Sequence, residues 1–80
     1  MKSLLKQLTH RELEVFAEIA HAAVDGTCRT PGTLIRLRLR KPMNSREYTR
    51  ILASLERKGL LAQEVISKGV PRRITLIPAR

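Results

Sequence analysis

The sequence predicts an α+β domain in which three helices are followed by a β-hairpin. Up to Gly59, apolar residues recur at helical spacing in three segments, each with a recognisable start. After Gly59 the apolar period changes to two, and two segments rich in branched residues flank a stretch of turn residues. We expect helices over roughly residues 9–25, 31–39 and 45–58, and a hairpin over roughly residues 61–77.

The length of 80 residues predicts a single domain, 1–80, in which residues 1–8 form an amino-terminal extension. Aromatic residues are nearly absent, so the core has to be built from aliphatic side chains between short elements. The core is expected to contain Phe16, Ile19, Leu34, Ile51, Leu52, Leu55 and Ile74.

The first helix has a capping box at its start. The Thr9 hydroxyl can accept from the amide of Glu12, while the Glu12 side chain reaches back to the amide of Thr9. Further along, Val15 and Ile19 fall on one face. Gly26 is predicted to end this helix.

The second segment contains the stretch LIRLRLRKP, residues 34–42, which has three interpretations. Its alternation suits an amphipathic strand, its charge suits a membrane-seeking helix, and its position suits the supporting helix of a DNA-binding unit. Thr30 as N-cap and Pro31 at the first helical position favour a helix, and Pro42 ends it by about Arg40. The alternation leaves the strand as an open alternative, whereas the lack of aromatic anchors disfavours the membrane.

The third helix carries the strongest signal in the chain. Asn44 is its expected N-cap with Glu47 as capping partner, and Gly59 is its expected stop. Helical spacing gives an apolar face and an opposite, exposed face. The apolar face contains Tyr48, Ile51, Leu52 and Leu55, and the exposed face contains Arg46, Thr49, Arg50 and Ala53.

Residues 61–66 and 72–77 are the expected strands, joined by the turn residues 67–71. The tight connection over residues 40–43 between the second and third helices has the spacing of a helix-turn-helix.

The charge indicates a polyanionic partner. The chain carries 16 Lys and Arg against seven Asp and Glu, a net charge of +9 with a pI near 11.2, and the excess falls almost wholly after Cys28. Nucleic acid is the usual partner of such a protein, with an anionic membrane or a simple solubility charge as alternatives.

Other kinds of site have little support in the sequence. Cys28 is read as a small buried hydrophobe in a reducing cytosol, and with two His residues it makes no zinc set. We expect no enzyme activity, no catalytic residue, no metal, no cofactor and no small-molecule ligand, because no nucleophile has a base to activate it. No apolar run approaches a spanning length, and a cytoplasmic, nucleoid-associated protein is expected.

The order of these segments resembles the amino-terminal DNA-binding domain of LexA-type SOS repressors, over residues 8–77. The likeness rests on LTHRELEVFAEI, on the Thr30-Pro31 start, on SLERKGLL at the end of the third helix and on SKGVPRRITL in the hairpin. The resemblance implies a winged helix-turn-helix whose third helix reads the major groove and whose hairpin is the wing.

The site residues expected from this interpretation form two sets. The first would read base edges from the third helix: Asn44, Ser45, Arg46, Glu47, Thr49 and Arg50. The second would hold phosphates from the wing and the second helix: Lys68, Arg72, Arg73, Arg36, Arg38, Arg40 and Lys41. Each of these side chains could instead be a solvated surface residue, and Glu47 a cap alone.

The chain departs from the family in three respects. We expect no self-cleaving carboxy-terminal domain, the turn has Arg40-Lys41 in place of the family's glycine, and the third helix has Arg46 and Arg50 where the family has small or acidic residues. A different target sequence is therefore expected.

The predicted function is a sequence-specific double-stranded DNA-binding protein acting as a small transcriptional regulator, a repressor, of bacterial, plasmid or phage type. We expect a weak homodimer or pairing on DNA, with residues 1–8 as the candidate surface. The alternatives are a winged-helix module that binds protein or RNA, and a DNA-binding accessory factor in recombination or plasmid maintenance.

Overall fold

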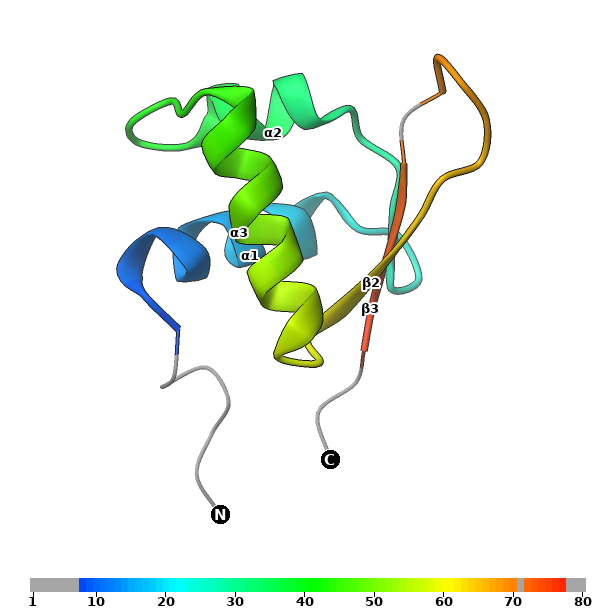
Figure 1. The fold of residues 1–80 in the computed structure, drawn as a ribbon, viewed down its shortest axis with the longest axis horizontal. Helices are drawn as coiled ribbons and strands as arrows, with labels where there is room; N and C mark the ends of the chain where they lie inside the picture. The colour runs from blue at the N-terminus through cyan, green and yellow to red at the C-terminus, as the bar shows by residue number, and fades with distance from the viewer. Residues whose placement is uncertain (1–7, 71, 78–80) are drawn as a thin grey trace.

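The structure is a computed structural model that describes residues 8–70 and 72–77. Within these residues the elements follow the order α1 (His10–Ala22), β1 (Thr27–Cys28), α2 (Gly32–Arg38), α3 (Ser45–Arg57), β2 (Leu61–Glu64) and β3 (Arg73–Leu76). The strands form an antiparallel sheet in the order β1-β3-β2, which lies beside the helices (Figure 1). The predicted α+β class is confirmed.

Both predicted side-chain N-caps at the long helices are confirmed, because each depends only on residues three apart. At α1 the Glu12 amide donates to the Thr9 hydroxyl over 3.1 Å, and the Thr9 amide donates to the Glu12 carboxylate over 2.9 Å. At α3 the Glu47 amide donates to Asn44 Oδ1 over 2.8 Å, whereas the Glu47 carboxylate, the expected capping partner, lies 3.7 Å from the Arg11 guanidinium of α1. The two helices therefore start within one residue of their predicted positions.

The end of the first helix was predicted wrongly. The helix ends at Ala22, and Gly26 belongs to a tight turn in which Val24 and Thr27 exchange backbone hydrogen bonds. Asp25 and Gly26 have φ angles of 53° and 79°, the left-handed conformation that an Asp-Gly pair supplies in a two-residue hairpin turn. The turn leads into β1, an unpredicted strand, whose Thr27 and Cys28 pair with Thr75 and Ile74 of β3.

The second helix is confirmed as a helix over most of residues 31–39, but two details were wrong. Its N-cap is Pro31 rather than Thr30, and no side chain caps it. Its buried residue is Ile35, and the C-cap Leu39 that follows the helix is buried too, while the predicted core residue Leu34 is 46% exposed. As a helix, the alternating sequence places Leu34 and Leu37 on one flank and Ile35 and Leu39 on another. Packing against α1 and α3 buries the flank of Ile35 and Leu39.

The end of α3 is closed as predicted. Gly59, with a φ of 80°, donates to the Glu56 carbonyl, and the Leu60 amide donates to the Leu55 carbonyl. This is the Schellman pattern, in which a left-handed glycine ends the helix and turns the chain. Leu60 and Leu61 are buried directly after it, so the turn also delivers β2 to the core.

The predicted hairpin is confirmed with shorter strands. Leu61, Ala62, Gln63 and Glu64 pair with Leu76, Thr75, Ile74 and Arg73. Residues 65–70 and 72 lie in the connection between the two strands. In this connection the Val70 amide donates to the Ser67 carbonyl over 3.2 Å, and Gly69 has a left-handed backbone conformation.

The hydrophobic core lies where the three helices meet the sheet. Five of the seven predicted core residues are buried, Phe16 packs against the core while partly exposed, and Leu34 lies outside it. Cys28 is buried, as predicted, and buried residues that were not predicted include Met43 and Leu60. Of the expected association surface at residues 1–8, only Leu8 lies within the described residues, where it packs against the core.

Candidate nucleic-acid interface

Two side chains anchor the connection between α2 and α3. Arg36 Nη1 donates to the Met43 carbonyl over 3.1 Å, and the Met43 side chain is buried. This bond fixes the residue just before the Asn44 cap, and so it fixes the start of α3 relative to α2. Arg36 was predicted to hold phosphates, and the bond gives it a structural contact within the domain.

The first turns of α3 present the predicted reading residues to solvent. Five of the six are exposed: Asn44, Ser45, Arg46, Thr49 and Arg50. Arg46, Thr49 and Arg50 are three and four residues apart, so they share the face opposite Tyr48 and Leu52. Glu47 is half-buried, and its carboxylate lies 3.7 Å from the Arg11 guanidinium of α1.

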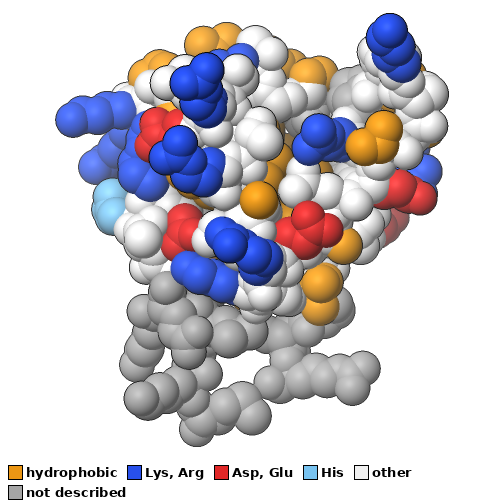
Figure 2. Space-filling view, viewed as in Figure 1, with side chains coloured by type: hydrophobic (Ala, Val, Ile, Leu, Met, Phe, Trp, Pro, Cys, Tyr) orange, Lys and Arg blue, Asp and Glu red, His pale blue; other side chains and the backbone are white. Residues whose placement is uncertain are grey.

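Most of the predicted phosphate-holding residues also lie on the surface. Arg38, Arg40 and Lys41 are exposed at the end of α2 and in the following loop, and Lys68 is exposed in the hairpin turn. Figure 2 shows Lys and Arg side chains at the upper left, over the α2–α3 region, and at the hairpin tip at the upper right. Acidic side chains lie among them on the same face, so the positive charge is interrupted rather than continuous.

The two hairpin arginines have different partners. Arg73 Nη1 lies 3.2 Å from the Glu64 carboxylate, its cross-strand neighbour. Arg72 Nη1 donates to Gln63 Oε1 over 3.1 Å. Gln63 was not predicted as a site residue, because its position beside Arg72 depends on the strand register, which local sequence does not specify.

A groove of about 280 Å³ separates α3 from the hairpin. Leu52 and Ile74 give it apolar walls, while Thr30, Thr49 and Arg72 supply hydroxyl and guanidinium donors. It is the place where the start of α2, one side of α3 and the hairpin come together, and the predicted site residues Thr49 and Arg72 both line it.

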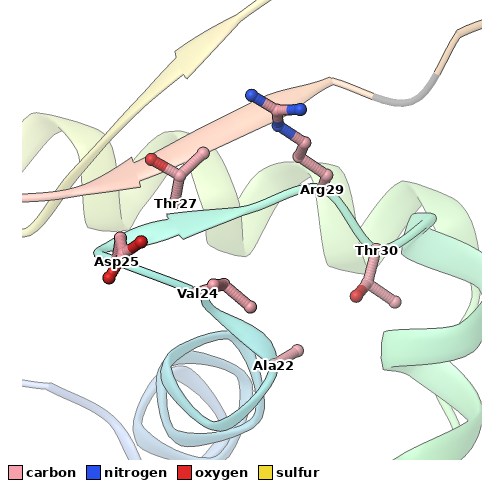
Figure 3. A pocket seen from close by; sticks show the side chains of 6 residues that line it. All are labelled: Ala22, Val24, Asp25, Thr27, Arg29 and Thr30. Atoms are coloured by element: carbon pink, nitrogen blue, oxygen red, sulfur yellow. The ribbon is translucent and has the colours of Figure 1, made fainter.

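A second depression, of about 580 Å³, lies between the end of α1, the Asp25-Gly26 turn and the loop into α2 (Figure 3). In Figure 3 the Arg29 side chain extends toward β3, whereas Asp25, Val24 and Ala22 project in other directions. The side chains of this depression therefore point in different directions in this view.

A buried carboxylate links α1 to α3, and sequence analysis predicted only its capping role. Glu12 accepts from Lys58 Nζ over 2.8 Å and from the Ser54 hydroxyl, in addition to the Thr9 amide. The hydrogen bond from Lys58 and those from Ser54 and Thr9 lower the pKa of Glu12 from 4.5 to about 2, against the opposing effect of burial. The sequence feature that could have revealed this link is a glutamate on a helix face that is otherwise apolar.

The residues described contain no group of three metal-ligating side chains, and they contain no helix that combines the length and hydropathy needed to cross a bilayer. Comparison of the chain with protein-family models, curated proteins and solved structures gives no match.

Proposed function

We propose that the chain is a winged helix-turn-helix domain that binds double-stranded DNA sequence-specifically and acts as a small transcriptional regulator. The observation that best supports this proposal is that Arg46, Thr49 and Arg50 are exposed on one face of α3, in a chain with a net charge of +9. A helix fits the major groove, and Arg makes bidentate contacts with guanine there. In this proposal α3 is the reading helix and the β2–β3 hairpin is the wing.

The local geometry supports this assignment. The Arg36 bond to the Met43 carbonyl and the Asn44 cap hold the start of α3, so its exposed residues project from a rigid element. Arg38, Arg40, Lys41 and Lys68 lie on the surface around it and would contact phosphates. Phosphate contacts would supply affinity and register, and the α3 residues would supply sequence preference.

The test begins with selection of bound sites from random duplexes, followed by titration of the selected duplex and a scrambled one. Arg50→Ala should weaken binding to the selected site by about 1 to 3 kcal/mol and should affect the scrambled duplex much less. Arg57→Ala is the matched control, because it removes the same charge from an exposed position in the last turn of α3. Equal losses for the two variants on both duplexes would contradict a reading role for Arg50.

A second candidate is a winged-helix module that binds protein, and the exposed leucines of α2 favour it. Leu34 and Leu37, three residues apart, are 46% and 63% exposed. If wild-type protein fails to bind any duplex at low salt, the DNA proposal is wrong and this candidate takes its place. An accessory role in recombination or plasmid maintenance would share the DNA contacts and differ in the sites selected.

A further inference from the structure

The two adjacent arginines of the hairpin project toward opposite faces of the sheet. Side chains alternate along a strand, and the buried Ile74 points toward the helices. Arg72, two residues earlier, shares that side and lines the groove against α3. Arg73 therefore projects toward the other side, as does its cross-strand partner Glu64. Of the two arginines, only Arg72 lines this groove, together with the exposed Thr49 of α3.

The partners of the two side chains also differ in charge. A carboxylate 3.2 Å from Arg73 offsets its positive charge, whereas Arg72 is bonded to the neutral amide of Gln63. A neutral acceptor orients a guanidinium without neutralising it, and the guanidinium keeps further N–H donors for a ligand. Arg72 is thus the hairpin arginine that remains available to an anion on the α3 side.

The orientation of the Gln63 amide is itself determined by α3. Gln63 Nε2 donates to Glu56 Oε1 over 3.1 Å, and the Gln63 backbone amide lies 3.4 Å from Glu56 Oε2. Because the NH₂ group faces Glu56, the amide oxygen faces Arg72. A chain of hydrogen bonds, Glu56 to Gln63 to Arg72, thus runs from α3 across β2 to the start of β3.

We propose that Gln63 is a positioning residue that holds Arg72 at the groove between α3 and the hairpin, where Arg72 and the Thr49 hydroxyl bind a backbone phosphate. Arg73 serves strand pairing with Glu64 and contacts no phosphate. This inference rests on the proposed DNA-binding function, and it replaces the expectation that both arginines hold phosphates.

The experiment is a double-mutant cycle on a random-sequence duplex, which isolates phosphate contacts from base reading. Dissociation constants are measured across a salt series for wild type, Gln63→Ala, Arg72→Ala and the double variant. Arg73→Ala serves as the charge-matched control, and thermal unfolding verifies that every variant is folded.

Arg72→Ala should weaken binding about tenfold. It should also make the fall of log affinity with log salt less steep, by about one unit of slope. Gln63→Ala should weaken binding several-fold and change the slope in the same direction, but should have no effect once Arg72 is replaced. Arg73→Ala should leave the slope unchanged. A merely structural role of Gln63 would not change the number of ions released on binding.

Two results would overturn the inference while leaving DNA binding intact. One is an equal slope change for Arg72→Ala and Arg73→Ala. The other is a Gln63→Ala effect that persists in the Arg72→Ala background. Failure of the wild-type protein to bind the duplex at low salt would instead overturn the proposed function itself.

Discussion

Replacing Glu12 with Gln tests the main polar link between α1 and α3. Glutamine keeps the size of the side chain and an acceptor for the Thr9 amide, but it removes the charge that faces Lys58. The Glu12 side chain is only 7% exposed, whereas the Lys58 side chain is 31% exposed and can turn to water. The substitution therefore isolates the value of the buried carboxylate.

The expected magnitude follows from the pKa of Glu12. A carboxyl whose pKa falls from 4.5 to about 2 on folding gains about 3 kcal/mol of stability when ionised. Solvent screening through the partly exposed Lys58 reduces this value, and we expect Glu12→Gln to cost about 2 kcal/mol at neutral pH. Because the folded pKa is lowered, the contribution is complete above about pH 4.5 and is lost as the pH falls toward 2.

Urea unfolding followed by circular dichroism, repeated from neutral pH down to about pH 2, measures the difference between wild type and variant. That difference should shrink over the acid range named above. Glu64→Gln is the control, since its carboxylate is exposed and its ion pair with Arg73 should contribute less than about 1 kcal/mol. A difference that stays constant with pH would refute the reasoning, because a pure packing effect does not titrate.

Two further substitutions test the contact of α3 with the start of α2. The Tyr48 hydroxyl is buried without a hydrogen-bond partner among the described residues. Tyr48→Phe should therefore leave the free energy of unfolding unchanged or raise it by about 1 kcal/mol. Burial, together with the nearby Cys28 thiol and against the effect of Arg36, raises the pKa of Tyr48 from 10.0 to about 12. Wild type should therefore lose stability as the pH rises from 10 to 12, and Tyr48→Phe should lack this loss; an identical alkaline profile would contradict the prediction. Gly32→Ala should cost about 1 to 2 kcal/mol in urea unfolding, because the added Cβ would lie 2.9 Å from Tyr48 Cε2. The exposed neighbour Thr33→Ala is its control, and a stabilised Gly32→Ala would mean that the ring moves aside freely.

The sequence by itself determined the features that depend on near neighbours in the chain. The Thr9 and Asn44 caps and the Gly59 stop each involve residues within five positions, so their chemistry could be recognised before any packing was known. The apolar face of α3 was also predictable, because Tyr48, Ile51, Leu52 and Leu55 repeat at one helical phase.

Only the tertiary structure decided the features that depend on distant residues. The strand β1 exists because β3, more than forty residues later, supplies its hydrogen bonds, and the Asp25-Gly26 turn allows it to form. In α2, the alternating leucines and arginines did not show which side of the helix faces the core. Packing against α1 and α3 decides this, because it buries Ile35 and leaves Leu34 exposed.

The candidate interface divides in the same way. The exposed face of α3 followed from helical period alone, so Arg46, Thr49 and Arg50 could be named from the sequence. The roles of Arg72 and Arg73 could not, because they depend on strand register and on which partner each side chain meets. A shift of one residue in that register would exchange their faces, and local sequence leaves the register open while the packing of Ile74 against the core selects it.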